Sequence, residues 1–294
     1  MAQNPNRVLD KTFLSLDLAE ERVLIHRDYL AHCLRWSHVV KYLNQAHRFK
    51  EARVLDVGCG KEMPLAKLLY VNKMSPANYV GVDANKFDVP SMLVGKKIPI
   101  TIWAETDFCT LDASDVSASD TETLLPNVVV SFEVLEHVVP SHCRRMLQHM
   151  RDLTTEDCKY FISTPCYNGS AAGNHVNEMT YQALGALFED LGFGIDAVNG
   201  TFASISDYKD RLSPELAKTF NELREYYDTN VLSIIFAPLF PAESRNCLWT
   251  LSKHKSKDYV GKFPPLAEVP GPWTQHPRWR DLAGPAVEEA KEVA

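Results

Sequence analysis

Four acidic residues recur in this sequence at intervals that match one repeating structural unit. They are separated by 27, 24 and 26 residues, and each follows a short apolar segment; they are Asp56, Asp83, Asp107 and Glu133. A strand, its crossover helix and the connecting turns need about this length. Because parallel strands end at the same edge of a sheet, we expect these carboxylates to line one edge, where open α/β sheets bind ligands. Carboxylates there can accept hydrogen bonds from the hydroxyls of a ribose or from an amino group.

The first acid leads directly into a glycine turn. Residues 54–60 read Val-Leu-Asp-Val-Gly-Cys-Gly, and helix-forming sequence follows from Met63 to Val71. Gly58 and Gly60 lack a Cβ, so the backbone can turn tightly and a ligand can approach it closely. A nicotinamide dinucleotide site would need a third glycine where this chain has Met63, and the chain has no G-x-x-x-x-G-K-[ST] loop for a triphosphate. The pattern favours a nucleoside-like cofactor without a pyrophosphate and disfavours a dehydrogenase.

The elements that position these residues alternate between strand and helix. We expect strands at residues 54–57, 79–83, 98–103, 128–132, 159–163, 195–198 and 246–252, with helices at 63–71, 141–153, 179–191 and 214–227. The fold class is therefore α/β, a doubly wound and mostly parallel sheet of about seven strands. We divide the chain into an N-terminal helical cap (1–50), a cofactor-binding domain (51–252) with an insertion at 201–245 before the last strand, and a tail rich in Pro and Trp (253–294).

Composition restricts the classes of partner. The chain of 294 residues has a formal net charge of -7 and a sequence pI of about 5.8, which does not favour a protein that binds a phosphate backbone. Its seven cysteines include no Cys-x-x-Cys pair, so we expect a reduced, cytoplasmic protein with free thiols. His137, His142 and Cys143 match no common zinc pattern, and we expect no metal. We also expect no secretory signal and no membrane span.

The ordered motifs resemble those of class I S-adenosylmethionine-dependent methyltransferases. Residues 54–60 resemble the first motif, residues 80–83 the second, and Asp107-Phe108 falls at the third. Residues 130–138, which contain Glu-Val-Leu-Glu-His, closely resemble the fourth motif in one subgroup of the family. Residues 162–165 and 175–193 resemble the segments around the fifth and sixth strands. The resemblance covers about residues 50–200 and implies S-adenosyl-L-methionine as cofactor.

The resemblance also assigns roles to individual residues. The ribose hydroxyls would be held by Asp83, with Ala84 beside it, and the adenine would contact Asp107 and Phe108. Asp56 would orient the glycine turn, formed by Gly58, Cys59 and Gly60, or hold the ammonium group of the cofactor. Phe132 and Glu133 would line the methionine end of the cofactor, unless Glu133 caps the next helix. Arg35, Trp36 and His38 would form a lid over the cofactor, or a helix packed on the sheet.

His137 is the main catalytic candidate, because it follows the fourth strand and imidazole can accept a proton near neutral pH. Methyl transfer depends mainly on alignment, so the alternative is that His137 forms a wall of the acceptor pocket or starts the next helix. Further substrate contacts are expected from Glu136, Tyr167, Asn174 and His175. Cys166 is a weaker candidate, as a nucleophile for pyrimidine methylation. The second motif that such enzymes need after the fourth strand is missing.

The methyl acceptor is left open by the sequence. We expect an O, N or C nucleophile of a small molecule or nucleotide, selected by the 201–245 insertion with its aromatic residues Tyr208, Tyr226, Tyr227 and Phe236. A nucleic acid or modified base is the alternative acceptor, with the insertion and tail as a stacking surface. A non-catalytic protein that binds S-adenosylmethionine as a partner or scaffold is the third possibility.

Overall fold

One seven-stranded sheet forms the centre of the molecule. The computed structural model describes residues 27–95, 98–119, 123–255 and 263–271, together with residues 273, 274, 276 and 279. The strands are β1 (Arg53–Val57), β2 (Asn78–Val82), β3 (Ile100–Trp103), β4 (Val128–Phe132), β5 (Lys159–Pro165), β6 (Gly194–Phe202) and β7 (Asn246–Ser252). Their order is β3-β2-β1-β4-β5-β7-β6, and β7 runs in the direction opposite to the other six strands. The expected doubly wound, mostly parallel sheet is confirmed.

The central strands form because nearly all of their side chains are buried. All five residues of β2 and of β4 are buried, so these short strands are covered on both faces. The sheet order places β1 between β2 and β4, with Asp56 in register with Gly81 and Val130. The strand ends that carry Asp83 and Glu133 therefore flank the glycine turn after β1.

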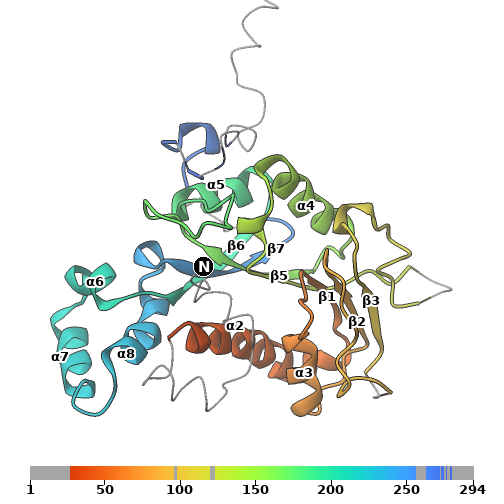
Figure 1. Cartoon of the computed structure of the whole chain (residues 1–294), viewed down its shortest axis with the longest axis horizontal. Helices are drawn as coiled ribbons and strands as arrows, with labels where there is room; N and C mark the ends of the chain where they lie inside the picture. The colour runs from red at the N-terminus through yellow and green to blue at the C-terminus, as the bar shows by residue number, and fades with distance from the viewer. Residues whose placement is uncertain are drawn as a thin grey trace, which may run out of the picture.

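Helices cover both faces of the sheet (Figure 1). The longer helices are α2 (Arg27–Asn44), α3 (Pro64–Val71), α4 (Pro140–Asp152) and α5 (Tyr181–Asp190). Helices α2 and α3 lie on one face, where Trp36, Val39 and Leu43 share a core with Leu65 and Leu69. Helices α4 and α5 lie on the other face, in a core that also includes Trp273. This tryptophan, from the Pro- and Trp-rich tail, is 1% exposed.

The segment between β6 and β7 forms a lobe with its own small core. It contains α6 (Ile205–Tyr208), α7 (Pro214–Leu223) and α8 (Thr229–Phe236), which extend away from the sheet (Figure 1). Tyr208 and Phe236 belong to its buried cluster, whereas Tyr226 and Tyr227 are exposed. The helix expected to reach residue 227 ends at Leu223, and β6 continues to Phe202, beyond the expected end at 198.

Short one-turn helices complete the described chain. They are η2 (Gln45–Lys50), η3 (Phe108–Thr110), η4 (Leu135–His137), η5 (Lys209–Arg211), η6 (Ala237–Leu239), η7 (Pro241–Glu243) and η8 (Leu266–Glu268). Among the described helices, none is both long and apolar enough to cross a membrane. The proposed cap at 1–50 and tail at 253–294 lie partly outside the described residues, so the domain boundaries stay a prediction.

Candidate functional site

The glycine turn after β1 is fixed to the end of β2. The backbone N–H groups of Gly58 and Cys59 both donate to the carbonyl of Val82, at 2.7 and 3.1 Å. Gly58 has φ +76°, and a Cβ on it would lie 2.2 Å from a methyl carbon of Val134. Gly60 has φ +65°, but a Cβ there would meet nothing within 4 Å. Gly58 is therefore required by packing and conformation, while Gly60 leaves open space beside the backbone.

Asp83 joins the second strand to this turn. Its Oδ2 accepts from the Gly60 N–H at 2.9 Å, and its Oδ1 accepts from the backbone and side-chain amides of Asn85, at 2.8 and 2.9 Å. Only 8% of Asp83 is exposed, and the neighbouring Ala84 is exposed. The structure thus brings together the acid and the glycines that the sequence assigned to one ligand.

Asp56 has a different partner from the one expected. Its Oδ2 accepts a short hydrogen bond from the Tyr79 hydroxyl, and Oδ1 is buried with no hydrogen-bond partner among the described residues. Burial, opposed by the Tyr79 bond and reinforced by Asp83, raises the pKa of Asp56 to about 7. The glycine turn is held by Asp83 and not by Asp56, because the Asp56 side chain turns toward the adjacent strand β2.

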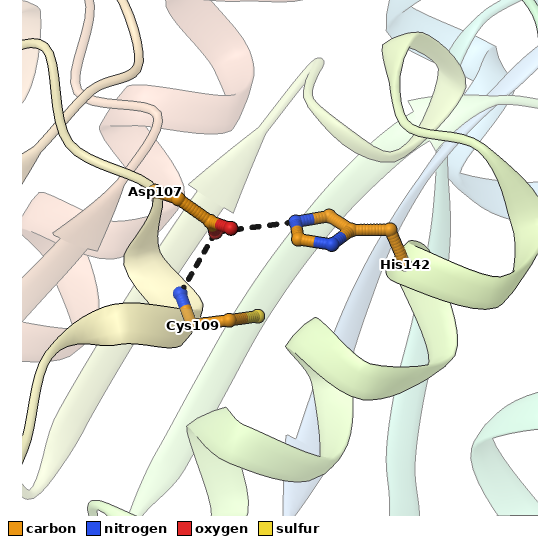
Figure 2. A group of neighbouring side chains, drawn as sticks. All are labelled: Asp107, Cys109 and His142. Carbon is orange, nitrogen blue, oxygen red and sulfur yellow. Dashed lines mark hydrogen bonds and ion pairs between the residues drawn. The ribbon is translucent and has the colours of Figure 1, made fainter.

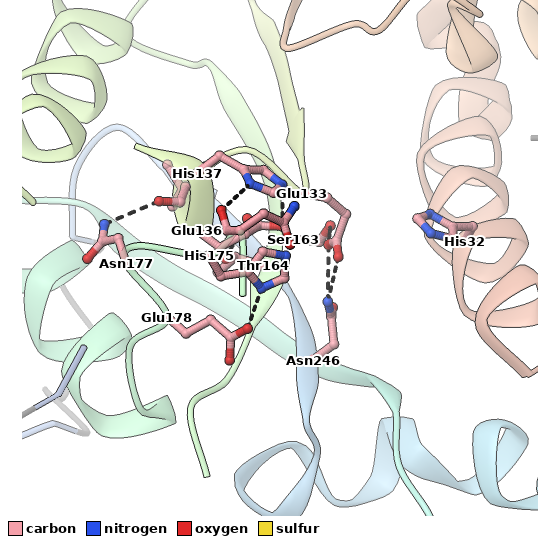
Figure 3. A network of polar contacts seen from close by, with 12 residues as sticks. His32, Glu133, Glu136, His137, Ser163, Thr164, His175, Asn177, Glu178 and Asn246 are labelled. Carbon is pink, nitrogen blue, oxygen red and sulfur yellow. Dashed lines mark hydrogen bonds and ion pairs between the residues drawn. The ribbon is translucent and has the colours of Figure 1, made fainter. Parts of the chain in front are cut away.

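Glu133 lies at the centre of a buried polar network at the end of β4 (Figure 3). Its Oε1 accepts from Arg35 at 2.7 Å and from Ser163 at 2.8 Å, and Asn246 donates to both of its oxygens. Burial alone would raise the pKa of Glu133, but Arg35, His32 and these hydrogen bonds overcome burial and lower it. Glu133 has φ +58° and caps no helix, since Val134 holds the cap position of η4.

Helix α2 supplies Arg35 to this network. From the sequence, Arg35 was expected only on a lid or on a helix packed against the sheet. Arg35 is 2% exposed, and besides Glu133 its guanidinium contacts Asn246 and His32. Burial and then Arg35 lower the pKa of His32 to about 3. Trp36 packs its ring 4.5 Å from that of Phe132. No short-range pattern relates Arg35 to Asn246, because 211 residues separate them.

A second polar group lies just beyond Glu133 and contains three expected site residues (Figure 3). Potential ligand atoms of Glu136, His137 and His175 all lie within 4.8 Å of one another. Glu136 is 1% exposed and accepts from Thr164, and burial, then Glu133, raise its pKa well above the ordinary value. The rings of His137 and His175 have their centroids 4.8 Å apart.

The remaining expected substrate residues lie along the loop after β5. The carbonyl of Asn174 lies 3.3 Å from Nδ1 of His137, and the Tyr167 N–H donates to Met179. Cys166, the alternative nucleophile, is 5% exposed and forms a bridge with Met179. The structure therefore brings Asn174 to the Glu136 group and leaves Cys166 buried against the sheet.

Asp107 lies after β3 and contacts α4 (Figure 2). Its Oδ1 accepts from the Cys109 N–H at 2.9 Å and lies 3.2 Å from His142, while Oδ2 lies 3.3 Å from Arg145. The next residue, Phe108, is buried with its ring against His149. Asp107 is exposed, so its carboxylate is reachable although both oxygens have partners.

Comparison with known proteins gives one family match. The model of a family described as "Methyltransferase domain" matches residues 26–198. None of the curated proteins matches this chain.

Several solved structures are similar to this one. The magnesium protoporphyrin IX methyltransferase of Synechocystis PCC 6803, with bound SAH, has 13% identity and a TM-score of 0.48, covering 85% of this chain and 100% of that one. The 1,6-didemethyltoxoflavin-N1-methyltransferase of Burkholderia thailandensis has 16% identity and a TM-score of 0.45, covering 79% and 92%. A SAM-dependent methyltransferase of Archaeoglobus fulgidus has 18% identity and a TM-score of 0.42, covering 74% and 94%. At these values, what those proteins act on does not bear on this chain.

Proposed function

We propose that this chain, which belongs to the methyltransferase-domain family and is an S-adenosylmethionine-dependent enzyme, methylates a small molecule. When bound, S-adenosylmethionine supplies a methyl group on a positively charged sulfur, which a nucleophile can displace. The protein has to hold the cofactor, orient the acceptor and exclude water from the reacting atoms.

The residues around the glycine turn fit such a cofactor. The open space beside Gly60 lets a ligand approach the backbone, and the unpartnered Oδ1 of Asp56 could accept from an ammonium group. We propose that Asp83 and Ala84 hold the ribose, and that Asp107 and Phe108 contact the adenine. Gly58, Cys59, Gly60, Phe132 and Glu133 would line the rest of the cofactor.

The bond from the Gly60 N–H to Asp83 is the observation that carries this proposal. It places the first glycine motif and the acid after β2 in direct contact, although 23 residues separate them. One ligand can then touch the turn and the carboxylate at once, as a nucleoside attached to an amino acid would.

The charge of the site favours a small acceptor. Asp83 and Asp107 follow the ends of β2 and β3, and the whole chain has a formal net charge of -7. A nucleic-acid backbone is bound by clustered lysines and arginines. Arg35 is buried against Glu133, so it adds no cation to an exposed surface. We propose that the acceptor lies beside the exposed ring of His137, with Glu136, Tyr167, Asn174 and His175 around it.

Calorimetric titration tests the cofactor part. We expect S-adenosylhomocysteine to bind and oxidised nicotinamide dinucleotide to give no heat. Asp83→Asn should weaken S-adenosylhomocysteine binding by about 1.5–3 kcal/mol, the scale of a hydrogen bond to a charged group. Equal binding by wild type and Asp83→Asn would reject the assigned ribose site.

The acceptor part needs a separate measurement. A cell extract is divided by size into a small-molecule fraction and a macromolecular fraction, and each is incubated with the enzyme and methyl-labelled cofactor. We expect enzyme-dependent label in the small-molecule fraction, and His137→Ala should reduce it without changing S-adenosylhomocysteine affinity. Label confined to nucleic acid, with an affinity that falls steeply with salt, would instead establish the alternative acceptor.

A further inference from the structure

Glu136, His137 and His175 come from two chain segments that the backbone holds together. Glu136 and His137 belong to η4, and His175 lies in the loop before α5. The backbone N–H groups of Val176 and Asn177 both donate to the Glu136 carbonyl, at 2.8 and 3.1 Å. These bonds explain why two histidines and a carboxylate meet with their ligand atoms within 4.8 Å of one another (Figure 3).

Both histidine rings are oriented through Nδ1. Nδ1 of His137 lies 3.3 Å from the Asn174 carbonyl, and Nδ1 of His175 contacts the carboxylate of Glu178. With an acceptor at Nδ1, the hydrogen of the neutral ring resides there and the lone pair is on Nε2. Metal-binding histidines show this arrangement, in which a carbonyl or carboxylate holds one nitrogen so that the other can ligate. Nε2 of His137 already points at Oε1 of Glu136, 3.8 Å away.

Glu136 is the kind of carboxylate that benefits from a bound cation. It is 1% exposed, and its Oε2 accepts a hydrogen bond from Thr164 at 3.0 Å. A buried carboxylate is costly unless it is paired or coordinates a metal. Glu133 does not compete for the same role, because Arg35 and Asn246 already bind its oxygens.

We propose that Glu136, His137 and His175 bind one divalent transition-metal ion, and that this ion holds a hydroxyl oxygen of the methyl acceptor. Two imidazoles and one carboxylate suit Zn²⁺, Mn²⁺, Fe²⁺, Co²⁺ or Ni²⁺ and leave coordination positions for other ligands. Ligand atoms about 2.1 Å from one ion lie roughly 3.0–4.2 Å apart, so the observed group needs only a small side-chain closure.

The acceptor class follows from where the ion would lie, and this part rests on the proposed function. Val134, two residues before Glu136, packs over Gly58 in the glycine turn, so the ion would lie close to the cofactor. A metal lowers the pKa of an oxygen that it binds, and the hydroxyl proton leaves to solvent. The oxygen lone pair then forms the new C–O bond, while the C–S bond breaks and its electron pair stays on sulfur.

A second three-residue group serves as an internal comparison. Asp107, Cys109 and His142 also have ligand atoms within 4.8 Å of one another (Figure 2). Arg145 lies 3.3 Å from the Asp107 carboxylate, so a cation already competes there, and the group is more exposed. We therefore do not assign an ion to it, and His142 is a suitable control position.

Cobalt binding tests the metal site without any acceptor. Untagged protein is stripped with a chelator and titrated with Co²⁺, and the visible absorption of protein-bound cobalt is recorded with and without S-adenosylhomocysteine. We expect one Co²⁺ per chain in wild type. His137→Ala, His175→Ala and Glu136→Gln should abolish the band, whereas His142→Ala should retain it. Glu178→Gln should lower the affinity for Co²⁺ about 10–100-fold, as is typical of residues that orient a metal ligand.

Cofactor binding and activity separate this proposal from the proposed function. Each variant is checked for S-adenosylhomocysteine binding, which shows that it is folded. If wild type does not bind S-adenosylhomocysteine, the proposed function is wrong. If wild type binds S-adenosylhomocysteine but not Co²⁺, the metal site alone is wrong. Cobalt binding that is lost in His142→Ala but kept in His175→Ala would also overturn the metal site.

The acceptor part predicts that chelated enzyme loses O-methylation at least tenfold and regains it with Mn²⁺ or Zn²⁺. Undiminished methylation by chelated enzyme would reject that part.

Discussion

The guanidinium of Arg35 donates to the carboxylate of Glu133 at 2.7 Å and so connects helix α2 to the end of β4, across 98 residues of sequence. Both groups are largely removed from water, with side-chain exposures of 2% and 24%. Asn246, the first residue of β7, bonds to both partners. The pair therefore fixes three distant segments of the chain around the proposed methionine end of the cofactor.

Breaking this pair should destabilise the protein strongly. Removing one partner of a buried ion pair leaves an uncompensated charge and costs about 3–5 kcal/mol. We expect Arg35→Met to lower the free energy of unfolding by this amount, and Arg35→Met/Glu133→Gln to be more stable than the sum of the single changes predicts. Urea denaturation of all four proteins measures the coupling.

An exposed pair provides the control. Lys218 and Glu222 lie 3.9 Å apart on α7, with side chains 78% and 66% exposed. The same cycle there should give a coupling no larger than about 0.5 kcal/mol. If the Arg35 and Glu133 substitutions change the free energy of unfolding additively, the contact between the two side chains does not stabilise the protein.

The sheet was predictable because each central strand is a short buried run. Residues 128–132 are apolar or small throughout, and both faces of β4 are covered. The glycine turn was predictable for a local reason as well, since Gly58 and Gly60 adopt positive φ where the chain turns from β1 to α3. These features depend on residues close in sequence, so the strands and most helices followed from pattern, whereas the bond from the Gly60 N–H to Asp83, across 23 residues, was not predicted.

The buried polar partners could not be predicted in the same way. Arg35 was placed on a lid or packing helix, yet its bond to Glu133 depends on how α2 crosses the sheet. Asn246 meets Glu133 only because β7 runs antiparallel to β5. Asp56 was expected to orient the glycine turn or to hold the ammonium group of the cofactor, but the Tyr79 hydroxyl on the neighbouring strand donates to one of its oxygens. Sequence spacing carries no information on such contacts.

Asp56 should make stability depend on pH in an unusual direction. Its folded pKa is about 7, above the 3.8 of the free side chain, so the folded state holds a proton that the unfolded state releases. The contribution of Asp56 is therefore greatest below pH 4 and is lost as pH rises toward 7. At about 1.4 kcal/mol per pKa unit, the loss is at most about 4 kcal/mol.

Asp56→Asn removes this dependence while leaving an acceptor for the Tyr79 hydroxyl. We expect the stability of Asp56→Asn relative to wild type to increase between pH 4 and pH 7 and then to level off. Urea unfolding at a series of pH values measures the difference. A constant difference across that range would show that Asp56 is ionised in the folded protein.

Asp107→Asn should separate cofactor binding from stability. The Asn side chain can keep the cap, with its oxygen accepting from Cys109, but it then turns its NH₂ group outward in place of a carboxylate oxygen. Losing a charged acceptor for the adenine amino group should weaken S-adenosylhomocysteine binding by about 1.5–3 kcal/mol. The contacts with Arg145 and His142 are exposed enough that stability should change by less than about 1 kcal/mol. Unchanged calorimetric affinity would remove Asp107 from the cofactor site.

The two glycines of the turn should respond differently to a methyl group. Both have positive φ, so alanine at either position costs about 1–2 kcal/mol of backbone strain. At Gly60 the new Cβ meets nothing within 4 Å, whereas at Gly58 it would lie 2.2 Å from the Cγ2 of Val134. Valine is stiff at χ1 and cannot simply rotate away. We therefore expect Gly58→Ala to be less stable than Gly60→Ala in urea unfolding.

Removing the Val134 methyl groups tests the cause. In the Gly58→Ala background, Val134→Ala should cost less than it does in wild type, because it relieves the overlap, and the Gly60→Ala background should show no such relief. If Val134→Ala costs the same in all three backgrounds, the packing of η4 on the glycine turn does not explain why position 58 needs glycine.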